Sequence, residues 1–200
     1  IKCKNILRNN NYSTPAWFEL SNCNEITKSF FPCIVKPNAQ GSTFGLTLVD
    51  KKSDLDKAVS NSLKFDKDIL IEEYISGREI TVGILDGEAL PVVEILPNHE
   101  IYDYKCKYTP GMTKYFCPAK LGEDLKNRIM FDSLKIFDLL NCRGYGRVDY
   151  IIDNNNNYYF LEINTLPGMT STSLLPIAAK TANISFNKLV KIIIEIGLKG

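Results

Sequence analysis

The chain has 200 residues and a net charge of +1, with 44% hydrophobic and 24% charged residues. This composition is typical of a compact, enzyme-like protein with one large domain or two small lobes. The near-neutral charge, without a basic stripe, excludes extended nucleic-acid binding. The apolar runs are too short for a spanning helix, so we expect no membrane partner.

The cysteines and the start of the sequence bear on the subcellular location of the protein. Six cysteines are scattered without any CxxC pair, which is typical of reduced thiols in a cytosol. No signal peptide opens the sequence. We therefore expect a cytoplasmic protein.

Apolar periodicity predicts helices alternating with strands. We expect helices over residues 2–10, 53–63, 123–140 and 186–196, and Ser53 is predicted to cap the second of them. Strands are expected over residues 16–20, 32–37, 46–49, 68–74, 78–85, 89–95, 147–153 and 158–164. The region 96–119 has three prolines and little periodicity, which is typical of a lid or binding loop.

The strands 147–153 and 158–164 are predicted to form a hairpin around a run of asparagines. Residues two apart on a strand share a face, so Glu162 and Asn164 should lie side by side. A symmetric turn places Asp149 nearly opposite Glu162. Three oxygen ligands would then converge, as Mg²⁺ or Mn²⁺ requires.

Two acids on a hairpin can also be solvated residues of its open face. Against this alternative, Glu162 stands between Leu161 and Ile163 in an apolar strand, where an uncompensated carboxylate would be costly. Arg147 also precedes Asp149 by two residues. The sequence therefore favours a metal site here.

The segment Asn38–Gly45, NAQGSTFG, follows Lys36 and offers small residues whose backbone N–H groups could approach phosphate oxygens. It lacks the P-loop spacing, and taken alone it is more typical of a glycine-serine hairpin turn between two strands. Further on, Glu72, Glu73 and Glu79 could accept hydrogen bonds from an adenosine. Taken alone, they are more typical of a solvated acidic turn.

The stretch 102–118 combines four tyrosines with three lysines. Such a loop could close over an anionic substrate and exclude water. Its aromatic and basic residues could also simply pack on the surface.

Five segments in order resemble the ATP-grasp ligases, and within them the D-alanine–D-alanine ligase family: VKPNAQGSTFG, LIEEYISGREITVGIL, IYDYKCKYTPGMTKYFCPA, GRVDYI and LEINTLPGMTSTSLLP. The resemblance covers nearly the whole chain. It implies an α+β fold of the ATP-grasp type, in which two α+β lobes hold a nucleotide between antiparallel sheets. It also implies a central lobe over residues 1–95, with a lid loop and a C-terminal catalytic lobe over 96–200.

The resemblance assigns a role to each matching residue. The implied ATP contacts are Lys36, Ser42, Thr43, Glu72, Glu73, Ile75, Glu79 and Lys107. The implied ligands of Mg²⁺ (or Mn²⁺) are Asp149, Glu162 and Asn164. The implied catalytic groups are Ser42, Lys107, Tyr108, Arg147 and Gly168. The implied clamp on the second substrate's carboxylate is formed by Ser173 and Leu174.

The implied reaction joins two D-alanines into D-alanyl-D-alanine through an acyl phosphate, for peptidoglycan precursor synthesis. Tyr108 is implied to favour the dipeptide over an ester product. The family's N-terminal domain has no counterpart here, so we expect these residues to bind Mg-nucleotide weakly and to ligate poorly. A homodimer is expected only for the full-length protein. Alternatives are another ATP-grasp carboxylate–amine ligase, a nucleotide-binding module without catalysis, and a fragment that merely folds.

Overall fold

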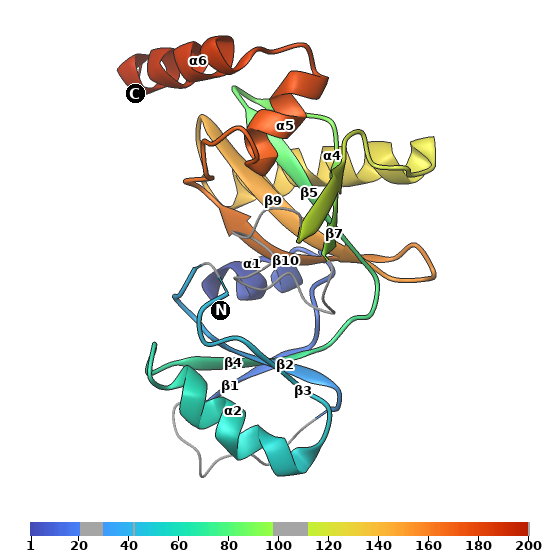
Figure 1. Ribbon diagram of the computed structural model, residues 1–200, viewed down its shortest axis with the longest axis vertical. Helices are drawn as coiled ribbons and strands as arrows, with labels where there is room; N and C mark the ends of the chain where they lie inside the picture. Colours follow the sequence, from blue (N-terminus) through green and yellow to red (C-terminus); the bar gives the residue numbers. More distant parts are fainter. Residues whose placement is uncertain (21–29, 42, 98–111, 200) are drawn as a thin grey trace. The chain divides into compact units, whose positions relative to one another are not determined.

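The computed structural model describes residues 1–20, 30–41, 43–97 and 112–199. The chain divides into two compact units, one formed mainly by Pro15–Ser76 and the other by Cys3–Thr14, Gly77–Leu96 and Lys114–Gly200. Each unit combines an antiparallel sheet with helices, as the α+β prediction requires (Figure 1). The lobes predicted over residues 1–95 and 96–200 have other boundaries than these units and remain a prediction.

The first unit is a four-stranded sheet with the strand order β1-β4-β2-β3. Its elements are β1 (Trp17–Leu20), β2 (Cys33–Pro37), β3 (Thr47–Val49), η2 (Lys52–Asp54), α2 (Leu55–Ser62) and β4 (Ile69–Glu73). Alternate residues of the central strands, such as Val35 and Ile71, are buried in one cluster with Val59 of α2. Because strand side chains alternate, Lys36 lies on the other face.

The predicted serine cap of the second helix is wrong. Ser53 lies inside the short 3₁₀ turn η2, and Asp54 occupies the N-cap position of α2 without a capping side-chain hydrogen bond. The 3₁₀ turn starts the helical geometry early, so the first turn of α2 does not depend on a side-chain cap.

The second unit contains a six-stranded sheet ordered β10-β9-β5-β7-β8, with β6 paired to β5. Its strands are β5 (Arg78–Leu85), β6 (Glu88–Ala89), β7 (Val93–Pro97), β8 (Thr113–Phe116), β9 (Tyr145–Ile152) and β10 (Tyr158–Asn164). Its helices are α1 (Lys2–Asn9), α4 (Glu123–Leu139), α5 (Leu174–Thr181) and α6 (Phe186–Lys199).

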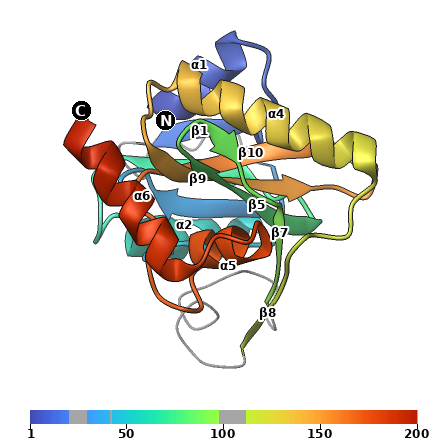
Figure 2. The same cartoon turned by 90° about the horizontal axis from the view of Figure 1, so that it is seen from above.

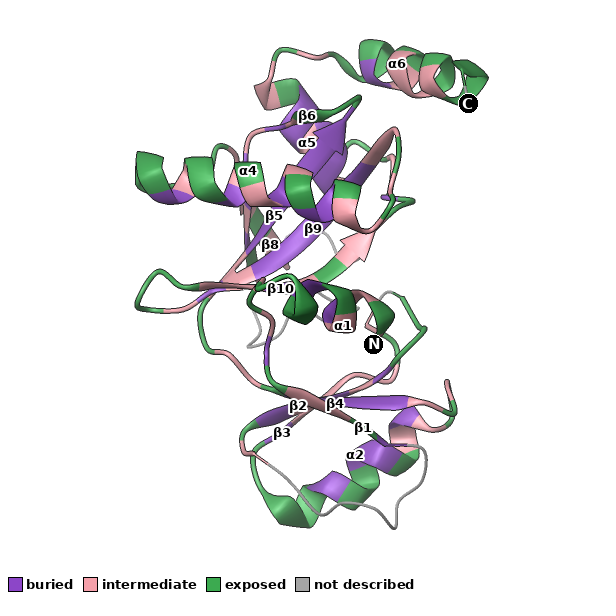
Figure 3. Cartoon of the chain, turned by 180° about the vertical axis from the view of Figure 1, so that it is seen from behind, coloured by how far each residue is buried: buried purple, intermediate pink, exposed green. Residues whose placement is uncertain are grey.

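The main core of this unit lies between α4 and one face of the sheet. Ile129 and Ile136 of α4 are buried in one cluster with Ile80, Val148 and Tyr150 of the strands. Figure 2 shows α4 along this face and α5 on the other side, and Figure 3 shows the buried strands beneath the exposed outer surface of α4. On the face opposite to α4, Leu175 of α5 lies next to Gly83 of β5, so α5 covers part of that face.

Most elements fall where the sequence predicts them, but three do not. The strand predicted over residues 89–95 is two short strands, β6 and β7, separated around Pro91, whose missing N–H interrupts the ladder. Strand β8 and helix α5 were not predicted as elements. In the described ranges, no helix combines the length and apolarity that crossing a bilayer demands.

Candidate active site

Four polar side chains lie on one face of the β9–β10 hairpin. Asp149 pairs with Glu162, and Arg147 pairs with Asn164. Directly paired residues of antiparallel strands share a face, so all four belong to the face opposite the core residue Val148. The predicted hairpin and the predicted pairing of Asp149 with Glu162 are confirmed.

The pairing depends on a β-bulge that the sequence did not reveal. Near the tip, Phe160 pairs with Tyr150, and the register then shifts so that Glu162 pairs with Asp149. Leu161 is the extra residue. Without the bulge, strict alternation would place Glu162 on the same face as the buried Phe160.

Asp149 is the buried acid of this face, with 5% of its surface exposed. Arg147 Nε donates to Asp149 Oδ1 and Arg147 Nη2 donates to Oδ2, both at 2.8 Å. Thr81 of β5 donates from Oγ1 to the same Oδ1 at 2.5 Å. A two-point guanidinium contact and a hydroxyl therefore compensate a carboxylate that burial alone would make costly.

The surroundings of Glu162 differ from those that its apolar neighbours in the sequence suggest. Glu162 is exposed, so its carboxylate does not carry the desolvation cost that its apolar neighbours in the sequence suggested. Asn164 is half-buried, and its Oδ1 accepts a hydrogen bond from the Leu166 N–H at 3.1 Å. The case for a ligand set now depends on the shared face and on the buried Asp149.

The donor chemistry of this face fits a hard divalent cation. Asp149 and Glu162 offer carboxylate oxygens and Asn164 offers an amide oxygen, which are the ligand atoms that Mg²⁺ prefers. In the parts of the chain that the structure describes, no three His, Cys, Asp or Glu side chains form a metal-binding group. Two carboxylates and an amide would therefore need water or phosphate oxygens to complete the coordination shell.

The loop before α5 carries the predicted carboxylate clamp. Ser173 occupies the N-cap position of α5, and its Oγ accepts from the Thr170 N–H at 3.0 Å. A Cβ at Gly168 would lie 2.9 Å from Ser173 Oγ, so a side chain there would displace the serine hydroxyl from its present position. Leu174 begins the helix, where unpaired backbone N–H groups favour anions.

In the first unit, Lys36 and Glu72 form an ion pair on the sheet face opposite α2, with Lys36 Nζ 2.8 Å from Glu72 Oε2. Glu72 is buried, with 2% of its surface exposed, so it is not a residue of a solvated turn. Glu73 is exposed and lies on the other face of β4. The structure therefore separates two neighbouring acids that the sequence treats alike.

The other predicted nucleotide contacts are distributed over both units. Ile75 follows β4 and is half-buried, and Thr43 adopts a left-handed φ of 63°. Such a conformation is strained for a β-branched residue and is common at functional loops. Glu79 lies two residues before Thr81 on β5, on the face of Asp149. Ser42, Lys107 and Tyr108 lie outside the described residues.

Thr81 is not among the predicted site residues, although the sequence carries a signal for it. Thr81 follows Glu79 at strand spacing, which places both on one face of β5. It is 1% exposed and pairs directly with Asp149. The polar residues of β5 that alternate with its apolar residues are the signal for Thr81, since they share a face with the polar residues of β9.

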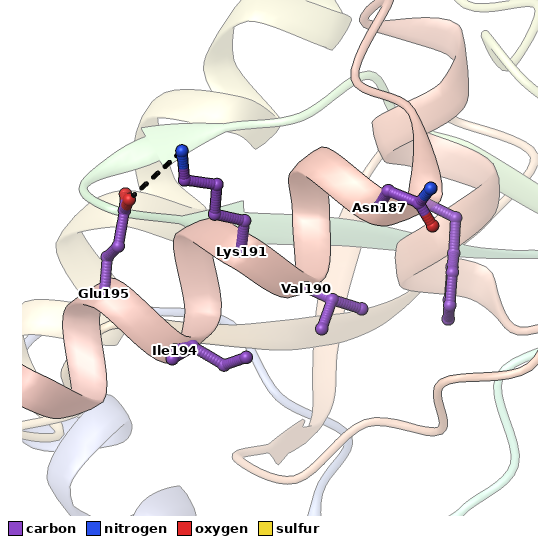
Figure 4. Close-up of a pocket in the computed structure, with 6 residues that line it drawn as sticks. Asn187, Val190, Lys191, Ile194 and Glu195 are labelled. Atoms are coloured by element: carbon purple, nitrogen blue, oxygen red, sulfur yellow. Dashed lines mark ion pairs between the residues drawn. The ribbon is translucent and has the colours of Figure 1, made fainter.

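A hollow of about 550 Å³ lies along α6 (Figure 4). Its lining residues are Phe186, Asn187, Val190, Lys191, Ile194 and Glu195. Lys191 and Glu195 form an exposed pair at 3.8 Å, which contributes little stability. The hollow has no group suited to phosphate or metal chemistry beyond this pair, so we do not assign it to the active site.

Comparison with known proteins identifies the family of this chain. The family model described as "D-ala D-ala ligase C-terminus" matches residues 7–195. A curated D-alanine–D-alanine ligase of Methylacidiphilum infernorum is 48% identical over 165 residues, covering 82% of this chain and 54% of that protein. One of Aquifex aeolicus is 40% identical over 194 residues, covering 96% and 66% respectively.

Solved structures give the same result. The D-alanine–D-alanine ligase of Bacillus anthracis superposes with a TM-score of 0.86 at 39% identity, over 98% of this chain and 66% of that one. Its complex with ATP gives 0.82 at 36% identity, over 98% and 64%. The VanG D-Ala:D-Ser ligase of Enterococcus faecalis gives 0.86 at 28% identity, over 98% and 60%.

These matches define an α+β protein of the ATP-grasp class. More narrowly, the chain belongs to the D-ala D-ala ligase C-terminus family. It spans about half the length of the first curated relatives that it matches.

Proposed function

We propose that the chain is the ATP-binding and catalytic part of a ligase that joins two D-alanines into D-alanyl-D-alanine, for peptidoglycan precursor synthesis. The observation that carries this proposal is the shared polar face of β9 and β10, where a buried Asp149 lies opposite Glu162 and beside Arg147. The family membership supports the choice of substrates.

In this proposal the first unit carries several of the ATP contacts. Lys36, Glu72 and the loop containing Ser42 and Thr43 belong to the first unit and would contact the nucleotide. Lys36 supplies a cation for phosphate oxygens, and its pair with the buried Glu72 fixes the position of its ammonium group. Glu73, Ile75, Glu79 and Lys107 complete the proposed ATP contacts.

Asp149, Glu162 and Asn164 would hold Mg²⁺ or Mn²⁺. When bound, the ion neutralises phosphate charge during transfer to the first D-alanine carboxylate. Arg147 and the Gly168 N–H would stabilise the oxygen that becomes negative when the second amine attacks the acyl phosphate. Ser173 and the Leu174 N–H would hold the second substrate's carboxylate and so orient its amine.

Lys107 and Tyr108 are proposed to act over the bound substrates together with Ser42. We also propose a cytoplasmic protein without a nucleic-acid or membrane partner, because ATP and free D-alanine are cytoplasmic metabolites. A homodimer is proposed for the full-length protein only.

A second candidate is a related ligase with another acceptor. It is favoured by one specific observation, since a solved neighbour is named a D-Ala:D-Ser ligase and superposes with the same TM-score as a D-alanine–D-alanine ligase. Product analysis with D-alanine, D-serine and D-lactate as acceptors separates the two candidates.

The first experiment measures phosphate release from Mg-ATP with and without D-alanine, together with detection of the dipeptide by mass spectrometry. It uses this chain and a version lengthened to the full span of the relatives. We expect D-alanine-dependent release mainly in the longer version. If neither version releases phosphate with any acceptor, the proposed function is wrong.

Asp149→Asn tests the residue that carries the proposal, and Asp153→Asn is its matched control. Asp153 is an acid of the same hairpin, but it lies at the turn, where it accepts hydrogen bonds from the N–H groups of Asn155 and Asn157 and from the Tyr159 hydroxyl. We expect the first variant to lose nearly all phosphate release and the second to keep it. Equal activity of the two variants would contradict the assignment.

A further inference from the structure

Thr81 holds the buried acid of the candidate active site from a neighbouring strand. It is 1% exposed and lies directly opposite Asp149 in the β5–β9 ladder. Its Oγ1 is 2.5 Å from Asp149 Oδ1 and 3.2 Å from the Val148 carbonyl oxygen. A hydroxyl has one hydrogen to donate, and the shorter contact to a charged acceptor is the stronger one.

The residue type matters because of its stiffness. A threonine has few χ1 rotamers in a strand, so the strand backbone fixes the direction of its hydroxyl. Arg147 lies on the same strand as Asp149, and its guanidinium group is carried by a long side chain. Thr81 is thus the rigid contact from a different strand, and together the two residues fix the carboxylate from two directions.

The hydrogen bonds also distinguish the two oxygens of Asp149. A carboxylate offers about four acceptor positions, two on each oxygen. Oδ1 accepts from Arg147 Nε and from Thr81 Oγ1, whereas Oδ2 accepts from Arg147 Nη2. The acceptor capacity left over therefore lies on Oδ2.

We propose that Thr81 is a positioning residue that saturates Asp149 Oδ1 and directs Oδ2 toward the divalent cation. The inference rests on the proposed function, because it requires Asp149 to be a metal ligand. Groups that hold a ligand in place typically change metal affinity by about 10–100-fold when they are removed.

The test is titration of Mn²⁺ in the presence of ADP, followed by electron paramagnetic resonance of the free ion, with thermal unfolding of each variant. Thr81→Val removes the hydroxyl and keeps the shape. We expect its Mn²⁺ affinity to fall at least about 10-fold. Thr181→Val, which removes a hydroxyl bonded to the Ile177 carbonyl in α5, should bind as the parent does.

A second pair keeps the test valid if the valine variant does not fold. Thr81→Ser and Thr81→Ala both lose the methyl group and differ only in the hydroxyl, so serine should bind Mn²⁺ at least about 10-fold more tightly than alanine. Equal affinity within this pair, or parental affinity of a folded valine variant, would overturn the proposal.

The outcomes distinguish a failure of the role of Thr81 from a failure of the metal-ligand role of Asp149. If Asp149→Asn weakens Mn²⁺ binding and Thr81→Val does not, the metal site stands and the role of Thr81 is wrong. If the parent does not bind Mn²⁺, or Asp149→Asn binds it as the parent does, both the ligand assignment and the role of Thr81 are wrong. Phosphate release in the lengthened protein is judged separately from these affinities.

Discussion

Gly77 precedes β5 at a point where the backbone passes unusually close to β9. A Cβ built on Gly77 would lie 2.0 Å from the carbonyl oxygen of Ile152 and 2.8 Å from its carbonyl carbon. Ordinary contact begins near 3.4 Å, and the atoms in the way are backbone atoms rather than a flexible side chain. Gly77→Ala must therefore move two segments of main chain apart.

The cost can be worked from the ladder next to this contact. The first pairs of the β5–β9 ladder are Arg78 with Ile152 and Glu79 with Ile151. A backbone hydrogen bond contributes about 1 kcal/mol net, and overpacking typically costs about 1–3 kcal/mol. We expect a loss of roughly 2–4 kcal/mol in the free energy of unfolding, and a melting temperature lower by roughly 4–16 °C.

The assay is calorimetry combined with hydrogen exchange, because the protein has two units and need not unfold in one step. Faster exchange should appear at the β9 amides near Ile152. Gly197→Ala is the matched control, since nothing lies within 4 Å of its new Cβ, and alanine favours a helix by up to about 1 kcal/mol. A Gly77→Ala variant as stable as the parent would refute the reasoning.

Three further predictions concern packing and buried polar groups. Leu189→Ala should cost about 2–5 kcal/mol because Leu189 is fully buried, whereas Ile194→Ala, at an exposed position, should cost about 0.5 kcal/mol or less; equal urea midpoints would contradict this. Ser133→Ala should cost about 1–3 kcal/mol, because the buried Tyr150 hydroxyl contacts Ser133 Oγ at 2.9 Å, and adding Tyr150→Phe should recover part of the loss. Burial raises the pKa of the Cys33 thiol to about 11, so only about one thiol in a thousand is ionised at pH 8, and iodoacetamide should leave Cys33 unmodified in peptide mapping until the protein unfolds.

The hairpin illustrates how far the sequence could lead. A symmetric turn about Asn155 and Asn156 predicts the pairing of Asp149 with Glu162, and that pairing is confirmed. The route to it differs, because the strands near the tip pair in another register and the bulge at Leu161 then shifts them by one residue. A bulge has no strong signature in a single sequence, so its presence could not be predicted.

Other features were hidden for physical reasons. Pro176 lies in the first turn of α5, where a missing N–H costs nothing, but in the sequence it argues against a helix. Glu162 is flanked by apolar residues and was expected to be shielded, yet it points away from the core. The hydrogen bond from Thr81 depends on the pairing of β5 with β9, which are far apart in the sequence.

The bulge at Leu161 reverses which face of the sheet the following residues of β10 occupy. Tyr158 and Phe160 lie on the core face of the sheet. Beyond the extra residue, Glu162 and Asn164 lie on the opposite, polar face. Adding or removing one residue on each side of the asparagine turn therefore leaves the residues of the polar face in place. Deleting Leu161 would remove the bulge and place Glu162 directly after Phe160, so Glu162 and Asn164 would keep their partners on β9 in a regular ladder.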